Sequence, residues 1–345
     1  MIRATNNLDA LRLLAALAVI VGHSFTLTGV AAAPRVLGIP IHSLGLYAFF
    51  AISGYLISTS WHRNPNLAAY LTNRCLRIFP ALILVVLATT FLIGPAASVL
   101  SSIDYLRSSM VYKYLLNISL AAQYELPGVF ETGHRSTAVN GVLWTLGLEF
   151  VCYLMIASIG ILLRGHRLWG YAVFGVIAVG FALAPADESA TSWMGPAGTT
   201  WAFFAVGALL SAAPTRWFNL MSLVAVLPIW IVTTALNPAA ATFIAWLALP
   251  FTVLVLGLAS TPGIRSLGRF GDLSYGMYLW GFLIQQLVIE WLNPLPWLVN
   301  TFLVISVTGA IAFASWHLVE KRALAHKIRV SPGQRARAIP SPVGP

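Results

Sequence analysis

Charged residues are scarce in this sequence. Of its 345 residues, 9% are charged and 59% are hydrophobic. A soluble domain has about a quarter of its residues charged, so this chain could not cover its surface with polar groups in water. The composition excludes an ordinary soluble protein and predicts a protein that lies in a lipid bilayer.

Cysteine is also rare. Cys75 and Cys152 are far apart, and neither belongs to a C-x-x-C pair or to another metal-ligand spacing. We therefore expect neither a disulfide framework nor a bound metal. The alternating pattern of membrane β-strands is missing too, which favours helices over a barrel.

Acidic residues are half as numerous as basic ones, and the net charge is +10. In a soluble protein such an excess would suggest nucleic-acid binding. In a membrane protein Lys and Arg instead collect in cytoplasmic loops. We therefore expect the bilayer, and no nucleic acid, as a partner.

Long apolar runs are abundant. A helix needs about 20 such residues to cross a bilayer. Arg3 precedes the first run, but no small-residue cleavage pattern follows, so we interpret this run as a retained helix. The sequence predicts an all-α, polytopic membrane protein with about ten transmembrane helices, at 8–28, 42–61, 78–98, 141–163, 169–186, 197–213, 217–236, 240–260, 272–292 and 297–319.

The segment 103–122 is ambiguous because it contains Asp104, Arg107 and Lys113. We expect an interfacial or re-entrant helix here, since an eleventh span would place the later "RGHR" and "EKR" clusters outside the cell. With ten spans and a cytoplasmic N-terminus, most basic residues lie in the cytoplasm, which predicts that both termini are cytoplasmic. The predicted domains are a transmembrane domain over 1–325 and a basic, disordered cytoplasmic tail over 326–345.

The first predicted span contains three ionisable residues. A charge at the bilayer centre costs about 2.5–3.5 kcal/mol on insertion scales and usually marks function. Asp9 and Arg12 share a helix face and can pair. The alternative is an interfacial ion pair that only orients the helix. His23 follows Arg12 by about three turns, roughly 16 Å along the axis. Its imidazole can act as a base, a nucleophile or a proton relay, or make a structural hydrogen bond.

Glu149 lies within a later span, at a depth similar to that of His23. A carboxylate at this depth must be paired, hydrated or protonated. We expect Glu149 and His23 to meet in a shared cavity, where the carboxylate orients the imidazole. The alternative is a polar contact between helices without a chemical role.

Two further segments are of interest, one with two arginines at the end of a helix and one with two small residues inside a helix. In "NRCLRIFP", Arg74 and Arg77 are three residues apart at the cytoplasmic end of a helix, and guanidinium groups suit phosphate oxygens. The alternative is ordinary positive-inside anchoring. In "FFAISGYLIS", Ser53 and Gly54 permit close helix packing, and no nucleophile elbow surrounds Ser53.

Five segments in order, "LDALRLLAALAVIVGHS", "FFAISGYLIS", "NRCLRIFPAL", "LWTLGLEFVCY" and "DLSYGMYLW", resemble the acyltransferase-3 family of membrane proteins. This family includes bacterial O-antigen and exopolysaccharide O-acetyltransferases. The resemblance implies a multi-pass enzyme of the bacterial inner (cytoplasmic) membrane. It implies transfer of an acyl group, usually acetyl, from an acyl-CoA to a hydroxyl of a glycan or glycolipid. Acetyl-CoA would be a donor substrate, with no permanently bound cofactor.

The resemblance also assigns residues. The family's basic-residue–ten–His motif falls on Arg12 and His23, with His23 essential, and its Arg-x-x-Arg motif falls on Arg74 and Arg77, where coenzyme A arrives. Its tryptophan-and-glutamate motif falls on Trp144 and Glu149. We therefore expect His23 and Glu149 to be catalytic and Arg12, Arg74 and Arg77 to bind the donor. Supporting roles in substrate binding or structure are expected for Asp9, Ser53 and Trp144.

The chain departs from the family pattern in two places. Relatives often have a histidine where this chain has Gly281, so we assign no histidine role to that helix. Many relatives carry a further hydrolase-like domain, and we expect transfer here to be completed in the membrane domain.

Two other classes of function stay open from the sequence. A proton-coupled membrane transporter is the main alternative, because intramembrane Asp, Arg, His and Glu also form proton pathways. A structural or sensory protein without turnover is the other. The sequence does not indicate an oligomeric state or the identity of the acceptor.

Overall fold

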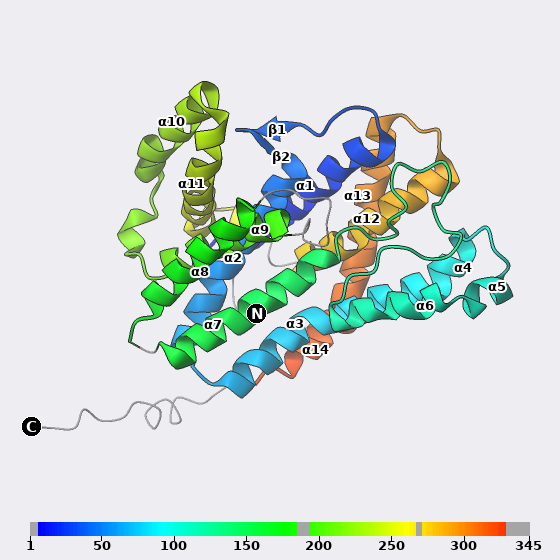
Figure 1. Cartoon of the computed structure of the whole chain (residues 1–345), viewed down its shortest axis with the longest axis horizontal. Coiled ribbons are helices and arrows are strands. Elements are labelled where there is room, and N and C mark those ends of the chain that lie inside the picture. Colours follow the sequence, from blue (N-terminus) through cyan, green and yellow to red (C-terminus); the bar gives the residue numbers. More distant parts are fainter. Residues whose placement is uncertain (1–5, 164, 185–193, 267–270, 329–345) are drawn as a thin grey trace, which may run out of the picture.

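The computed structural model describes residues 6–163, 165–184, 194–266 and 271–328 of the chain (Figure 1). These residues are mostly helical. The strands among them are β1 (Arg35–Val36) and β2 (Ile39–Pro40), which pair antiparallel in a hairpin between the first two helices. An all-α architecture is therefore confirmed for the described residues.

Each of the ten predicted spans falls on a helix. The third helix begins at Leu67 rather than at residue 78, and this earlier start places Arg74 and Arg77 inside a helix. It continues through a π-helical turn, Thr89–Ile93, into α4 (Gly94–Ala97). The helices that correspond to the predicted spans are α1 (Leu8–Thr28), α2 (Ile41–Arg63), α3 (Leu67–Ala88), α7 (Trp144–Leu162), α8 (Arg167–Ala182), α9 (Met194–Leu210), α10 (Leu220–Leu236), α11 (Pro238–Leu258), α12 (Leu273–Leu292) and α13 (Trp297–Ser315).

Six helical stretches among the described residues are long and apolar enough to cross a membrane. They are α1, α2, α3 with α4, α7, α11, and α13 with its extension through a π-helical turn (Trp316–Glu320) into α14 (Lys321–Ala325). Shorter apolar helices lie at α8, α9 and α10. A multi-pass membrane protein is thus supported, while the count of ten spans and the cytoplasmic termini stay predictions.

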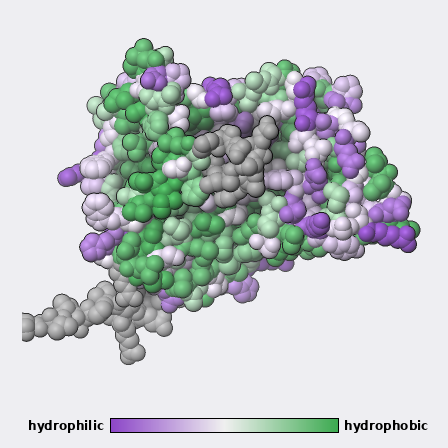
Figure 2. Space-filling view, in the orientation of Figure 1, coloured by the Kyte–Doolittle hydropathy of each residue, from purple (hydrophilic) through white to green (hydrophobic). Residues whose placement is uncertain are grey.

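The ambiguous segment 103–122 forms short helices. They are α5 (Ser102–Arg107), α6 (Ser109–Tyr114) and a 3₁₀ turn over Leu115–Ser119. Each is far shorter than the roughly 20 residues that a span requires, so the segment does not form an eleventh span. Figure 2 shows hydrophilic residues gathered at this end of the molecule, whereas hydrophobic residues predominate over α7, α8 and α10.

Helix α2 lies at the centre of the packing and contacts α1, α7, α9 and α11. The small residues of α2 allow the neighbouring helices to approach it closely. A Cβ added at Gly54 would lie 2.1 Å from the carbonyl oxygen of Phe204 in α9, and one added at Gly45 would lie 2.3 Å from that of Ala15 in α1. The prediction that Gly54 permits close helix packing is confirmed. Helix α12 packs on α1, α3 and α13, so polar side chains of α1, α2, α3, α7 and α12 can meet inside the bundle.

Candidate functional site

Helix α1 carries two of the predicted site residues at opposite ends. Arg12 lies near its start and His23 near its end. We refer to the corresponding sides of the bundle as the Arg12 end and the His23 end.

At the Arg12 end, two arginines share one carboxylate. Arg12 Nη1 donates to Asp272 Oδ2 at 2.9 Å, and Arg77 Nη2 donates to the same oxygen at 2.6 Å. Ser274 Oγ donates to the other oxygen, Oδ1, at 2.6 Å. Asp272 immediately precedes α12, where the positive end of the helix dipole favours a carboxylate. The expected pairing of Arg12 with Asp9 is therefore wrong: Arg12 is paired with Asp272, from a distant part of the sequence.

Glu149, on α7, is held by two hydroxyl groups. Ser53 Oγ from α2 donates to Glu149 Oε1 at 3.2 Å, and Tyr153 OH, one turn further along α7, donates to the same oxygen at 2.5 Å. Ser53 therefore does more than permit close helix packing, because its hydroxyl group also binds Glu149.

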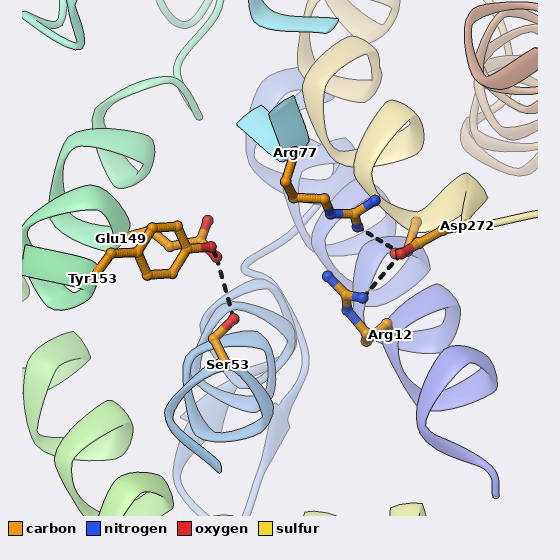
Figure 3. Close-up of polar contacts among 7 residues, drawn as sticks. Arg12, Ser53, Arg77, Glu149, Tyr153 and Asp272 are labelled. Atoms are coloured by element: carbon orange, nitrogen blue, oxygen red, sulfur yellow. Dashed lines mark hydrogen bonds and ion pairs between the residues drawn. The ribbon is translucent and has the colours of Figure 1, made fainter. Parts of the chain in front are cut away.

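These two groups of residues face each other across a cavity, which we call the polar cavity after its charged and hydroxyl-bearing side chains. Much of the rest of its wall is apolar, formed by Leu46, Phe49, Phe50, Ile78 and Leu146. Figure 3 shows Arg77, Asp272 and Arg12 on one side and Ser53, Glu149 and Tyr153 on the other. The volume of the cavity is about 40 Å³. A cavity of this volume holds a few water-sized groups, so the space suits a narrow chain. Its lining includes Arg12, Arg77, Ser53, Glu149, Tyr153, Thr145, Tyr275 and Tyr278.

At the His23 end lies a larger cavity, which we call the His23 chamber. Its volume is about 440 Å³, and its lining includes His23, His42, Tyr47, Trp144 and Thr200. The predicted site residue Trp144 therefore faces the same space as His23. A chamber of this size falls within the range of small-molecule binding sites.

The backbone fixes the tautomer of His23. Its Nδ1 lies 2.8 Å from the carbonyl oxygen of Val19, one turn earlier on α1. A carbonyl oxygen only accepts hydrogen bonds, so Nδ1 carries the proton. In the neutral ring Nε2 then keeps its lone pair, which can take a proton or attack an electrophile.

The expectation that Glu149 orients His23 is wrong. Glu149 lines the polar cavity, His23 lines the chamber, and Val19 supplies the hydrogen bond to the imidazole. Matched depth along the helices did not translate into contact, because the two residues face different spaces.

A hydrogen-bonded pair stands between the two cavities. Thr145 and Tyr278 line both of them, and their hydroxyl oxygens are 2.8 Å apart. Thr145 Oγ1 donates its proton to the carbonyl oxygen of Val142 at 2.9 Å, so Tyr278 must be the donor to Thr145. The polar cavity and the His23 chamber are therefore neighbours, separated by side chains rather than by a layer of backbone.

Arg74 differs from Arg77 although both belong to the same motif. Its guanidinium carbon lies 5.8 Å from the ring centre of Tyr70 and 5.9 Å from that of Tyr153, in cation–π contact. It forms no ion pair with any carboxylate that the structure describes, and its Nε is buried without a hydrogen-bond partner. The predicted pair thus consists of one arginine bound to Asp272 and one with free donors.

Sequence reasoning missed three residues of this site. Asp272 is the first residue of the predicted span 272–292, and its partners come from α1 and α3, far away in the sequence. Tyr153 lies four residues after Glu149, a spacing that places both side chains on one face and could have revealed the bond. The ring of His42 lies 5.1 Å from that of His23, and its position at the start of an apolar segment was the available signal. The described residues contain no cluster of His, Cys, Asp and Glu suited to a metal ion.

Comparison with known proteins covers nearly the whole chain. Residues 5–317 match the family described as an acyltransferase domain. An O-acetyl transferase of Shigella phage Sf6 is 30% identical over 336 residues, which cover 93% of this chain and 96% of that protein. Nodulation protein 10 of Rhizobium leguminosarum bv. viciae is 28% identical over 355 positions, which cover 94% of each chain. No solved structure matches the chain. The similarity extends from α1 through α13 and so includes both cavities.

Proposed function

This chain belongs to the acyltransferase-3 family, and from that premise we propose that it is a membrane O-acetyltransferase. The donor is acetyl-CoA, and the acceptor is a hydroxyl group of an envelope glycan or glycolipid. The observation that carries this proposal is the free Nε2 of His23 in a chamber next to an arginine-lined cavity. The similarity to the phage protein that is named an O-acetyl transferase supports acetyl as the transferred group.

The donor approaches from the Arg12 end, which we place at the cytoplasmic face of the bacterial inner membrane. The polar cavity is too narrow for a nucleotide but suits the thin arm that carries the thioester. Arg12 and Arg77 line it beside Glu149. Because the two guanidinium groups are held by Asp272, they keep a fixed place from which to donate to the thioester arm.

The acceptor occupies the His23 chamber. Its volume of about 440 Å³ accommodates a sugar residue. Aromatic side chains of Tyr47 and Trp144 and the hydroxyl of Thr200 offer the mixed apolar and hydrogen-bonding lining that a sugar requires. This end of α1 then faces the outer side of the membrane, where a lipid-linked or periplasmic glycan would be found.

His23 Nε2 carries out the central step by one of two routes. As a general base, it takes the proton of the acceptor hydroxyl while the oxygen attacks the thioester carbonyl carbon. The carbon–sulfur bond then breaks, and the proton returns to the thiolate, which gives the ester and free coenzyme A. As a nucleophile, Nε2 first bonds to the acetyl carbon and the carbon–sulfur bond breaks, which releases the thiolate. The acceptor oxygen then attacks the acetyl carbon, the carbon–nitrogen bond breaks, and the hydroxyl proton goes to the thiolate. Both routes require the tautomer that Val19 imposes.

A transfer assay in membranes tests the proposal. Inverted inner-membrane vesicles that contain the chain would be supplied with acetyl-CoA labelled in the acetyl group. We expect label in the glycan fraction that mild base releases, as for an ester. Vesicles with the His23→Ala variant, present in equal amount, should give background label. Equal labelling in both preparations would refute this role of His23, and a wild type that neither binds nor consumes acetyl-CoA would favour the transporter alternative.

A further inference from the structure

We propose that Arg74 and Lys327 together bind a phosphate group of the donor, so that residues 326–328, which follow α14, form part of the donor site. The inference rests on the proposed function, because acetyl-CoA is the phosphate-bearing ligand that the site would take. Lys327 lies outside residues 5–317, which match the family. The proposal therefore concerns a feature of this chain beyond the matched domain.

The cations at the Arg12 end fall into two kinds. Arg12 and Arg77 are each bonded to Asp272 and line the polar cavity. Arg74 and Lys327 have no carboxylate oxygen within 4.0 Å among the described residues. The first two are therefore already neutralised in part, whereas the second two have donors available for an added anion.

Two hydrogen bonds hold the segment after α14 against α3. The side chain of Asn73 accepts from the backbone nitrogen of Ile328 at 3.0 Å and donates to the carbonyl oxygen of Ile328 at 3.3 Å. Asn73 directly precedes Arg74 in sequence, and Ile328 directly follows Lys327. One side-chain amide thus holds the backbone next to Lys327 against the helix that carries Arg74, and Figure 1 shows α14 beside the first part of α3.

The electrostatics of Lys327 support this placement. Although Lys327 lies at the surface, partial burial and the nearby guanidinium groups of Arg74 and Arg77 lower the pKa of its ammonium group. Like charges repel, so their approach is unfavourable unless an anion joins them. A phosphate group suits this role, because it offers several oxygens to a guanidinium group and to an ammonium group at once.

The position of Arg74 relative to Arg77 agrees with the direction from which we propose that the donor enters. Arg74 precedes Arg77 by three residues, so it lies roughly 4.5 Å further toward the start of α3. A phosphate bound by Arg74 and Lys327 would sit outside the polar cavity, and the arm of the same molecule could extend inward past Arg77. The narrow cavity itself could not hold the phosphates together with the nucleotide.

Binding of acetyl-CoA to the detergent-purified full-length chain tests this inference. We compare wild type with Lys327→Gln and Arg74→Gln, and use Lys321→Gln on α14 as a control that removes the same charge from a nearby exposed site. A charge-assisted hydrogen bond contributes about 1.5–3 kcal/mol, so we expect affinity to fall about tenfold or more for Lys327→Gln and Arg74→Gln. The control should change it less than twofold. Asn73→Ala keeps every charge and should weaken binding in the same direction by releasing Ile328.

The choice of ligand identifies the phosphate. If Lys327 binds the 3′-phosphate, its replacement should weaken acetyl-CoA but leave the affinity for 3′-dephospho-acetyl-CoA unchanged. A loss with both ligands assigns Lys327 to the pyrophosphate instead. Inorganic phosphate at millimolar concentration serves as a competitor, and competition that is equally strong in wild type and Lys327→Gln would contradict the proposal.

The outcomes separate this inference from the proposed function. If wild type binds acetyl-CoA and Lys327→Gln binds it as tightly as Lys321→Gln does, the inference is overturned and the proposed function stands. If wild type does not bind acetyl-CoA at all, the proposed function itself fails. A melting temperature measured for each variant shows whether a loss of affinity reflects unfolding.

Discussion

The polar cavity and the His23 chamber differ in how their ionisable groups are held. Two arginines that line the polar cavity are bound by Asp272, and Glu149 accepts hydrogen bonds from two hydroxyl groups. In the chamber, the imidazole of His23 has a backbone carbonyl oxygen as its hydrogen-bond partner, and a second imidazole lies beside it. The volumes differ as well, about 40 Å³ against about 440 Å³.

This difference between the two cavities shows where a site inside a membrane can place charged groups and where it can place a neutral one. A charged group inside a bilayer is costly unless it is paired, so the charged residues occupy a narrow space in which each has a fixed partner. A neutral imidazole needs no counter-charge, so it can face a wide chamber with one nitrogen free. Under the proposed function, binding of the donor and chemistry on the acceptor would take place in neighbouring spaces, with Thr145 and Tyr278 between them.

The largest effect should come from the chamber. We expect His23→Ala to lower acetyl transfer by about 10³-fold, because general acid–base groups contribute roughly 10²–10⁴-fold. Affinity for acetyl-CoA should change little, since the donor site lies at the Arg12 end. The matched control is His42→Ala, which removes an imidazole from the same chamber. If His42→Ala lost as much transfer as His23→Ala, the special role of the His23 tautomer would be disproved.

The next effect should come from the shared carboxylate. In Asp272→Asn, Arg12 and Arg77 lose their ion pair within the bundle, and removal of one partner of such a pair costs about 3–5 kcal/mol. We expect a clear fall in the melting temperature of the purified protein, together with weaker binding of acetyl-CoA. Asp9→Asn is the control, because Asp9 forms no ion pair among the described residues. Equal melting temperatures for the two variants would contradict this account of Asp272.

A smaller effect should follow from Glu149→Gln. The amide oxygen of Gln can still accept from Ser53 and Tyr153, so the packing is kept while the charge is lost. Hydrogen bonds to a charged group are stronger than neutral ones by about 1 kcal/mol, which corresponds to roughly five- to tenfold in rate if the charge acts in the transition state. We therefore expect transfer to fall by this factor with little change in melting temperature. Unchanged transfer would assign Glu149 a purely structural role.

The smallest effect should come from the pair between the cavities. Tyr278→Phe keeps the ring and removes the hydrogen bond to Thr145, which contributes about 1 kcal/mol. We expect a small drop in melting temperature that Thr145→Val shares. Because both changes remove the same bond, the double variant should lose less stability than the two single losses added together. Additive losses would show that the hydroxyl groups do not act as a pair.

Much of the site was evident from residue types and their spacing. The scarcity of charge, the ten apolar segments and the positions of His23, Glu149, Arg74 and Arg77 follow from the order of residues along single helices. Each of the ten segments falls on a helix, and Trp144 faces the same chamber as His23. Periodicity could show these features because a helix places residues three, four or eleven apart on one face.

The errors concern contacts between helices. Asp9 shares a helix face with Arg12, yet Arg12 is bonded to Asp272, and Glu149 matches His23 in depth, yet the two line separate cavities. A sequence records how far along a helix a residue lies but not how that helix is rotated toward its neighbours. The same limit explains why Arg74 and Arg77 looked equivalent before their partners were known.

The sequence by itself determined that the chain is a helical membrane protein with ionisable residues placed inside its spans. The tertiary structure alone decided which of those residues are paired, which nitrogen of His23 is free, and that Asn73, next to Arg74, binds the backbone of Ile328, next to Lys327. The physical reason is that helix formation depends on local hydrogen bonds and apolar periodicity. Pairing of charges depends instead on the rotation and close approach of helices, which small residues such as Gly45 and Gly54 set through contacts distant in sequence.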